Sequence, residues 1–314
     1  MNKKYLANIA LFLTALIWGL SFVAQKAGMD FVGPFSFNFA RSILGGFSLL
    51  PVIGIVKLMQ EDKRTPIQKD VQHIRLAQGG IACGVALWIA MTIQQYCMLH
   101  APAGKAGFIT ALYIIYVPLI AMFFGKKVTR NVWISVGLAV IGLYLLCFKD
   151  SIGGFSIWDL WLLLAAFFYG LHIIVVNHFA RKANATKMSC VQFFVVGLLS
   201  IPLMLFFEEP TWASFVACKT PILYAGILTC GVAYTIQIFG QKFTSSPTVA
   251  SLILSLESVF AVVGGCLILH EVMSIKEIFG CLFMITAVIL SQLNAKPKKV
   301  EPSSEDEDPI PVSK

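Results

Sequence analysis

The sequence predicts an all-α integral membrane protein with ten transmembrane helices, arranged as two inverted five-helix repeats. Two observations lead to this fold class. Of the 314 residues, 58% are hydrophobic and only 13% are charged, whereas soluble domains average about 45–50% apolar and about 25% charged residues. In addition, short matching patterns recur in the same order in both halves of the chain. Together these features favour a bundle of membrane helices built from two related halves.

The apolar residues gather in runs that are long enough to cross a bilayer, because a membrane helix needs about 20 mostly apolar residues. The runs are continuous and do not alternate with polar residues, which favours helices over barrel strands. Short joints with Pro or Gly separate them and leave no room for an inserted soluble domain. The expected spans are 6–26, 34–57, 75–98, 102–124, 130–148, 157–180, 188–206, 220–242, 247–269 and 275–294.

Lysine and arginine residues indicate the orientation of these spans. If the spans alternate in direction, 18 of the 24 Lys and Arg residues fall on one side of the membrane, five fall on the other, and Arg41 lies inside a span. Cytoplasmic loops carry an excess of Lys and Arg, so we expect both termini in the cytoplasm and the protein in the plasma membrane. The formal net charge of +8 is then explained by residues that set the topology and contact anionic lipid headgroups. We expect no nucleic-acid partner.

The two halves of the chain share an internal repeat. Trp18-Gly19 matches Tyr169-Gly170, and the Cys-Gly-Val-Ala sequence that starts at Cys83 recurs letter for letter from Cys230. The offset is 151 residues in the first two spans, 147 in the third and 143 in the fifth, as unequal loop lengths would produce. Because each half has an odd number of spans, the second half starts on the opposite side of the membrane. Inverted repeats place a binding site near the bilayer midplane, between the halves.

The repeat also divides the chain. We expect a first five-helix repeat over residues 1–150 and a second over residues 151–295. Residues 296–314 are polar, acidic and contain proline. They cannot bury a core, and we predict a disordered cytoplasmic tail.

Several short motifs accompany the repeat. They are Ile17-Trp18-Gly19-Leu20-Ser21-Phe22, Phe39-Ala40-Arg41, Ser255-Leu256-Glu257-Ser258-Val259-Phe260-Ala261, Leu269-His270-Glu271 and Gly280. With the ten spans, they resemble the EamA-type branch of the drug/metabolite transporter superfamily over essentially all of residues 5–294. The chain departs from the family at Ser258, where proline is usual. The resemblance implies a carrier, often an exporter of amino acids or other metabolites, that works by alternating access without ATP.

Glu257 is the first candidate functional residue, because it lies near the middle of the ninth span. An ionised side chain at the centre of a bilayer costs a few kcal/mol and therefore needs a partner, a watery cavity or a function. Two interpretations stay open: Glu257 binds a proton or a cationic group of the substrate, or it is a structural glutamate that accepts hydrogen bonds from neighbouring helices. Proton-coupled export, facilitated diffusion and exchange stay open as well.

Aromatic residues lie at the same depth. Trp18, Trp88 and Tyr113 fall near the middle of three other spans, whereas aromatic side chains that face lipid gather at the interfaces. They indicate either a substrate cavity lined by indole and phenol groups or ordinary core packing.

Three further polar residues inside spans complete the candidate set. Arg41 either contacts an anionic substrate or serves helix packing and headgroups. His172 either relays protons or is hydrogen-bonded within the bundle. Gln237 adds hydrogen-bonding capacity at another level of the membrane. We expect a small-molecule substrate and the lipid bilayer as partners. Gly80-x-x-x-Gly84 is expected to form a helix-packing face within one subunit or between two subunits, so a homodimer is possible.

Other functional classes are less compatible with the sequence. The eight cysteines are scattered, without a C-x-x-C motif or a Cys/His cluster, so we expect no metal and no cofactor. An intramembrane lipid-modifying enzyme needs catalytic groups clustered at one interface. The only candidate loop, around Glu61, Asp62, Asp70 and His73, mixes both signs of charge and is interpreted as a solvated linker. We therefore expect no enzyme, and the lack of a repeated polar stripe argues against a channel.

Overall fold

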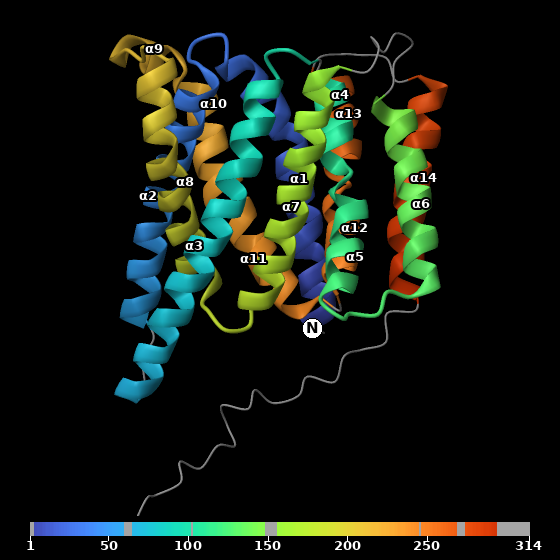
Figure 1. Ribbon diagram of the computed structural model, residues 1–314, viewed down its shortest axis with the longest axis horizontal. Helices are drawn as coiled ribbons and strands as arrows, with labels where there is room; N and C mark the ends of the chain where they lie inside the picture. Colours follow the sequence, from blue (N-terminus) through green and yellow to red (C-terminus); the bar gives the residue numbers. More distant parts are fainter. Residues whose placement is uncertain are drawn as a thin grey trace, which may run out of the picture.

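The computed structural model describes residues 3–59, 65–101, 103–147, 156–244, 246–268 and 274–293. Every regular element within these ranges is a helix, which confirms the all-α class. Figure 1 shows the long helices side by side in one bundle. The helices are α1 (Lys3–Gly28), α2 (Pro34–Met59), α3 (Pro66–Cys97), α4 (Ala103–Ala111), α5 (Tyr113–Phe123), α6 (Arg130–Cys147), α7 (Ile157–Phe179), α8 (Ala185–Phe207), α9 (Trp212–Ala217), α10 (Lys219–Leu223), the π-helix η1 (Tyr224–Ala233), α11 (Tyr234–Phe243), α12 (Pro247–Leu254), α13 (Glu257–Ile268) and α14 (Ile275–Leu293).

Eight helical segments of the described chain are long and apolar enough to cross a membrane. Two shorter apolar helices, Arg130–Leu146 and Pro247–Val263, coincide with the expected spans 130–148 and 247–269. Both of these expected spans extend beyond the described residues, as do Glu61, Asp62 and the predicted tail at 296–314. All ten expected runs fall on helices, and eight helical segments of the described chain are long and apolar enough for a complete span.

The start of α3 differs from the prediction. The sequence placed Asp70 and His73 in a linker before a span at residue 75, but α3 already begins at Pro66. The Thr65 hydroxyl accepts a hydrogen bond from the Gln68 backbone N–H, and the Gln68 side chain accepts one from the Thr65 N–H. This capping box satisfies backbone donors that the first helical turn leaves unpaired. The polar first turns of α3 project from one end of the bundle (Figure 1).

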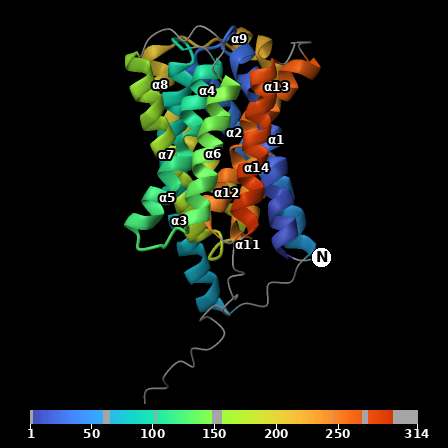
Figure 2. The ribbon, with the colours of Figure 1, turned by 90° about the vertical axis from the view of Figure 1, so that its right-hand side faces the viewer.

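The bundle has an upper and a lower end in the view of Figure 1. At the lower end α1 begins and α11 ends, and at the upper end α3 ends and α4 begins. The helices pack as related pairs: α2 packs on α8, and α6 packs on α14, which Figure 2 shows side by side. Likewise, α1 contacts α11 and α13, while α7 contacts α3 and α5. These contacts of α1 with the second half therefore have counterparts in the contacts of α7 with the first half.

Two of the expected spans are broken near mid-depth. The fourth consists of α4 and α5, separated at Leu112, and the ninth consists of α12 and α13, separated at Ser255 and Leu256. The second segment begins at Tyr113 in one case and at Glu257 in the other. Two candidate site residues thus start the second segments of two broken helices.

Candidate functional site

A cavity of about 50 Å³ lies between the two halves of the bundle. At roughly 10–15 Å³ of such volume per molecule, it has room for a few waters. Trp18, Arg41, Tyr113 and Glu257, which the sequence singled out, all line it. The other residues around it are Ser21, Phe22, Gln25, Met91, Gln94, Thr110, Tyr169, Thr229, Cys230 and Tyr234.

Glu257 enters this cavity from the break between α12 and α13. Its side chain accepts a hydrogen bond from the Tyr113 hydroxyl, with 3.2 Å between Oη and Oε1. Glu257 is also the first residue of α13, directly after the turn at Ser255 and Leu256. The hydrogen bond therefore joins the two helix breaks, one from each half of the chain.

Arg41 contributes a cation to the same cavity. Only 3% of its surface is exposed, and its guanidinium lies 5.4 Å from the centroid of the Phe37 ring. Its Nε–H is buried and has no hydrogen-bond acceptor among the described residues. Within that part of the chain neither Arg41 nor Glu257 has an ion-pair partner. One cavity therefore holds a buried cation and a buried carboxyl group that are not paired with each other.

Polar side chains above this level are hydrogen-bonded to one another. The Tyr169 hydroxyl donates to Gln94 Oε1 at 2.7 Å, and Gln94 Nε2 donates to Thr110 Oγ1 at 3.2 Å. Gln25 Nε2 donates to the Ser21 hydroxyl at 3.0 Å. These residues come from α1, α3, α4 and α7, so the upper part of the cavity is polar and is built by both halves.

Aromatic rings form the floor of the cavity. The Tyr234 ring lies 4.6 Å from the Trp18 ring and 5.1 Å from the Phe193 ring, measured between centroids. On its other side Tyr234 meets the His172 ring, at 5.9 Å. Tyr234 therefore separates the cavity from the polar residues of the lower half.

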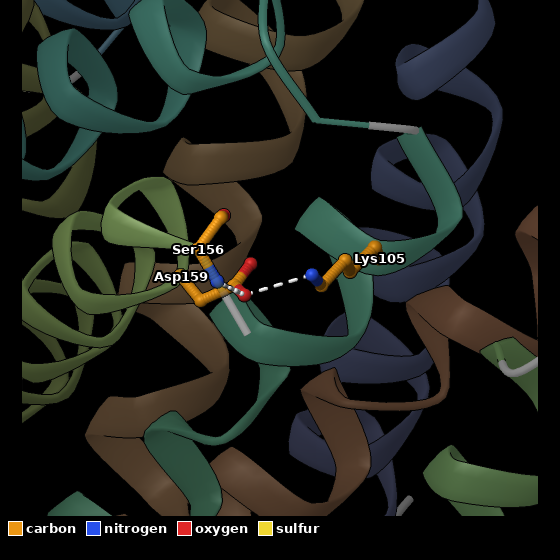
Figure 3. Close-up of polar contacts among 3 residues, drawn as sticks. All are labelled: Lys105, Ser156 and Asp159. Carbon is orange, nitrogen blue, oxygen red and sulfur yellow. Dashed lines mark hydrogen bonds and ion pairs between the residues drawn. The ribbon is translucent and has the colours of Figure 1, made fainter. Parts of the chain in front are cut away.

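An ion pair connects the two halves at the upper end. Lys105 on α4 donates to Asp159 Oδ2 on α7 at 2.7 Å, and the Ser156 N–H donates to the same oxygen at 2.8 Å (Figure 3). The Asp159 side chain is 3% exposed and that of Lys105 is 15% exposed. The Lys105–Asp159 ion pair lies at the start of both helices, and it connects the first half of the chain to the second above the cavity.

Comparison with known proteins identifies the family. The model of the EamA-like transporter family matches residues 5–148 and again residues 156–293. The chain belongs to the EamA-like transporter family. The two matches fall on the two halves that the internal repeat separates, and the resemblance seen in the sequence is confirmed.

Several individual proteins are also similar to the chain. An uncharacterized transporter of Archaeoglobus fulgidus is 31% identical over 93% of this chain and 87% of its own length. The uncharacterized transporter YoaV of Bacillus subtilis is 24% identical, over 91% and 96%. A probable terminal-alkyne amino-acid exporter of Streptantibioticus cattleyicolor is 21% identical, over 72% and 73%. A crystal structure with 16% identity superposes with a TM-score of 0.73 and covers 92% of this chain and 97% of its own, which shows the fold.

Three predicted site residues of this EamA protein lie outside the cavity lining. Trp88 packs against the core around Leu87 and Phe193, and its indole N–H is buried without an acceptor in the described structure. His172 is hydrogen-bonded to Gln192, with 3.2 Å between Nε2 and Oε1. Gln237 is fully buried, and neither polar atom of its amide has a partner among the described residues.

The sequence did not single out Tyr169, although it lines the cavity. The internal repeat carried the signal, because Tyr169 occupies the position of Trp18 in the second half. Ser21 and Thr110 gave no such signal, because isolated hydroxyl side chains are common in membrane helices.

Proposed function

We propose that the protein is a secondary carrier that moves a small zwitterion, an amino acid or a similar metabolite, across the plasma membrane by alternating access. The observation that carries the proposal is the cavity between the halves, which contains Arg41 and Glu257 without pairing them. A guanidinium stays protonated and binds carboxylates through two parallel hydrogen bonds. A carboxylate substrate group at Arg41 and an ammonium group at Glu257 would neutralise both buried charges.

The expected selectivity follows from the cost of a buried charge. Leaving one member of a buried pair without its partner costs several kcal/mol. A ligand with only one of the two charges would leave either Arg41 or Glu257 uncompensated. The site should therefore prefer molecules that carry both charges. The similarity to a probable terminal-alkyne amino-acid exporter of Streptantibioticus cattleyicolor supports this class.

Alternating access is supported by the way the halves relate to each other. Helix α1 of the first half contacts α11 and α13 of the second half, and helix α7 of the second half contacts α3 and α5 of the first. Two inverted repeats are expected to pack in this reciprocal way. Discontinuous helices at corresponding positions point to the binding site of such carriers, and here the breaks carry Tyr113 and Glu257. The orientation with cytoplasmic termini rests on the Lys and Arg distribution.

Counterflow in proteoliposomes tests this function. Vesicles with purified protein are loaded with one unlabelled amino acid at a time, and the uptake of the same labelled amino acid is followed. We expect saturable exchange that Arg41→Met and Glu257→Gln each reduce at least about tenfold, which corresponds to about 1.4 kcal/mol. Arg130→Met and Glu209→Gln are matched controls, because both residues are exposed. Exchange at the parent rate in both cavity variants would contradict the proposed site.

A further inference from the structure

A second group of polar residues lies below the aromatic floor. His172 is 1% exposed, and Gln192 and Gln241 are fully buried. His172 and Gln192 are hydrogen-bonded to each other, but Gln192 Nε2 and both polar atoms of the Gln241 amide have no hydrogen-bond partner in the described part of the chain. The lower half of the bundle therefore contains several unsatisfied polar groups in a closed environment.

Such groups are costly in a closed bundle. Each buried donor or acceptor without a partner costs about 1–3 kcal/mol, and native proteins keep few of them. An apolar side chain would fill the same space without this cost. The residues are therefore better explained by a second state of the protein in which water or a ligand reaches them.

The internal repeat relates this lower group to the upper cavity. At the offset of 151 residues, Ser21 corresponds to His172 and Arg41 to Gln192. At the offset of 147 residues in the third span, Gln94 corresponds to Gln241. Ser21, Arg41 and Gln94 all line the upper cavity. An inverted repeat places equivalent residues at mirrored depths, so the three lower residues occupy the positions of a cavity that faces the other side.

We propose that His172, Gln192 and Gln241 line the inner half of the transport path, which is closed in this structure and opens toward the lower end of the bundle. The inference rests on the alternating access of the proposed function and adds the residues that form its second cavity. Its ligand is the same small zwitterion. The imidazole and the amide oxygens accept hydrogen bonds from an ammonium group, and the amide N–H groups donate to a carboxylate.

An apolar cluster closes this path in the structure. Val176, Met188 and Ile238 are buried together between α7, α8 and α11. At the same two offsets, Val176 corresponds to Gln25 and Ile238 to Met91, and both of these line the upper cavity. Separation of α7 and α8 from α11 would therefore open the lower half at equivalent positions.

Thiol labelling from the lower side tests the inference without knowledge of the substrate. His172→Cys, Gln192→Cys and Gln241→Cys are placed singly in the full-length protein, and inside-out vesicles are treated with a membrane-impermeant methanethiosulfonate reagent. The parent protein measures the background from native cysteines, of which Cys83 and Cys190 are buried. Ser189→Cys is the matched control. Ser189 is fully buried on α8, one turn nearer the lower end than Gln192, and its hydroxyl also has no hydrogen-bond partner among the described residues. Its counterpart Asn38 is absent from the cavity lining, so Ser189 shares the burial and the missing partner with the test residues but not their correspondence to the upper cavity.

An inward-open state populated at about 1–10% should label the three test positions at least about tenfold faster than Ser189→Cys. Equal labelling of Ser189→Cys would indicate local loosening and would overturn the proposal. No labelling at the test positions, in variants that unfold at the temperature of the parent protein, would also overturn it, while counterflow by the parent protein would leave the proposed function intact. The expected labelling without counterflow of any zwitterion would instead support the inner cavity and reject the proposed substrate. Gln241→Cys lies near the end of α11 and keeps the test valid if a deeper variant does not fold.

Discussion

Gly19 on α1 packs directly against the start of α13 without room for a side chain, so Gly19→Ala should disturb the site. A Cβ atom at Gly19 would lie 2.5 Å from the Glu257 carbonyl oxygen, 2.7 Å from Phe260 Cβ and 2.9 Å from the Ala261 nitrogen. None of these atoms can move by a change of rotamer. Because ordinary contacts begin near 3.4 Å, α13 must shift by about 1 Å at Glu257.

The corresponding residue in the second half provides the matched control. A Cβ at Gly170 would lie 3.1 Å from Tyr116 Cβ and 3.5 Å from Val117 Cγ2, so a shift of a few tenths of an ångström accommodates it. Overpacking typically costs about 1–3 kcal/mol, and replacement of a helical glycine by alanine gains about 1 kcal/mol. Gly19→Ala should therefore lose up to about 2 kcal/mol of stability, whereas Gly170→Ala should be neutral or slightly stabilising.

Thermal unfolding in detergent and counterflow measure the two effects. At about 2–4 °C per kcal/mol, the melting temperature of Gly19→Ala should fall several degrees below that of Gly170→Ala. Exchange should slow at least about tenfold in Gly19→Ala alone, because a shift of about 1 Å disrupts the Tyr113–Glu257 hydrogen bond. Equal stability and equal exchange of the two variants would refute the idea that this close approach positions Glu257.

Three further predictions concern the charged and hydroxyl groups. Tyr113→Phe removes the donor to Glu257 and should lower the free energy of unfolding by about 1–3 kcal/mol, measured by thermal unfolding at neutral pH. Lys105→Met leaves the buried Asp159 carboxylate without its cation and should destabilise the protein more than the double variant Lys105→Met/Asp159→Asn does, which a double-mutant cycle measures. If Glu257 carries the coupled proton, Glu257→Gln should abolish the pH dependence of transport, whereas an unchanged pH profile of net flux in proteoliposomes would reject this coupling.

The positions of the helices could be predicted because span length and hydropathy follow from bilayer thickness alone. The early start of α3 could not, because residues 66–75 are polar and no bilayer constraint applies to them. The breaks at Leu112 and at Ser255–Leu256 were also missed. Neither site has the Pro or Gly that usually marks a helix break, so no familiar sequence signal identifies them.

Four of the seven predicted site residues line the cavity, although the assembly of these residues could not be predicted. Arg41 and Glu257 stood out individually, because an ionisable group within a span is rare. Nothing in the sequence places them in one cavity, since they are more than 200 residues apart and only the packing of α1 and α2 with α13 and the π-helix η1 unites them. The internal repeat does relate Tyr169 and the lower polar group to residues of the first half. Their possible function became visible only when the structure showed that those first-half residues line the cavity.

Binding of one amino acid and two of its derivatives tests the central claim most directly. An amino acid that exchanges in counterflow is compared with its methyl ester, which lacks the carboxylate, and with its N-acetyl derivative, which lacks the ammonium group, by ligand-dependent thermal stabilisation. The parent protein should bind each derivative at least about 30-fold more weakly, since an unpaired buried charge costs about 2–5 kcal/mol. Arg41→Met should abolish only the discrimination against the ester, and Glu257→Gln only that against the N-acetyl derivative. Equal binding of all three ligands, or discrimination unchanged by both variants, would contradict recognition of a zwitterion between Arg41 and Glu257.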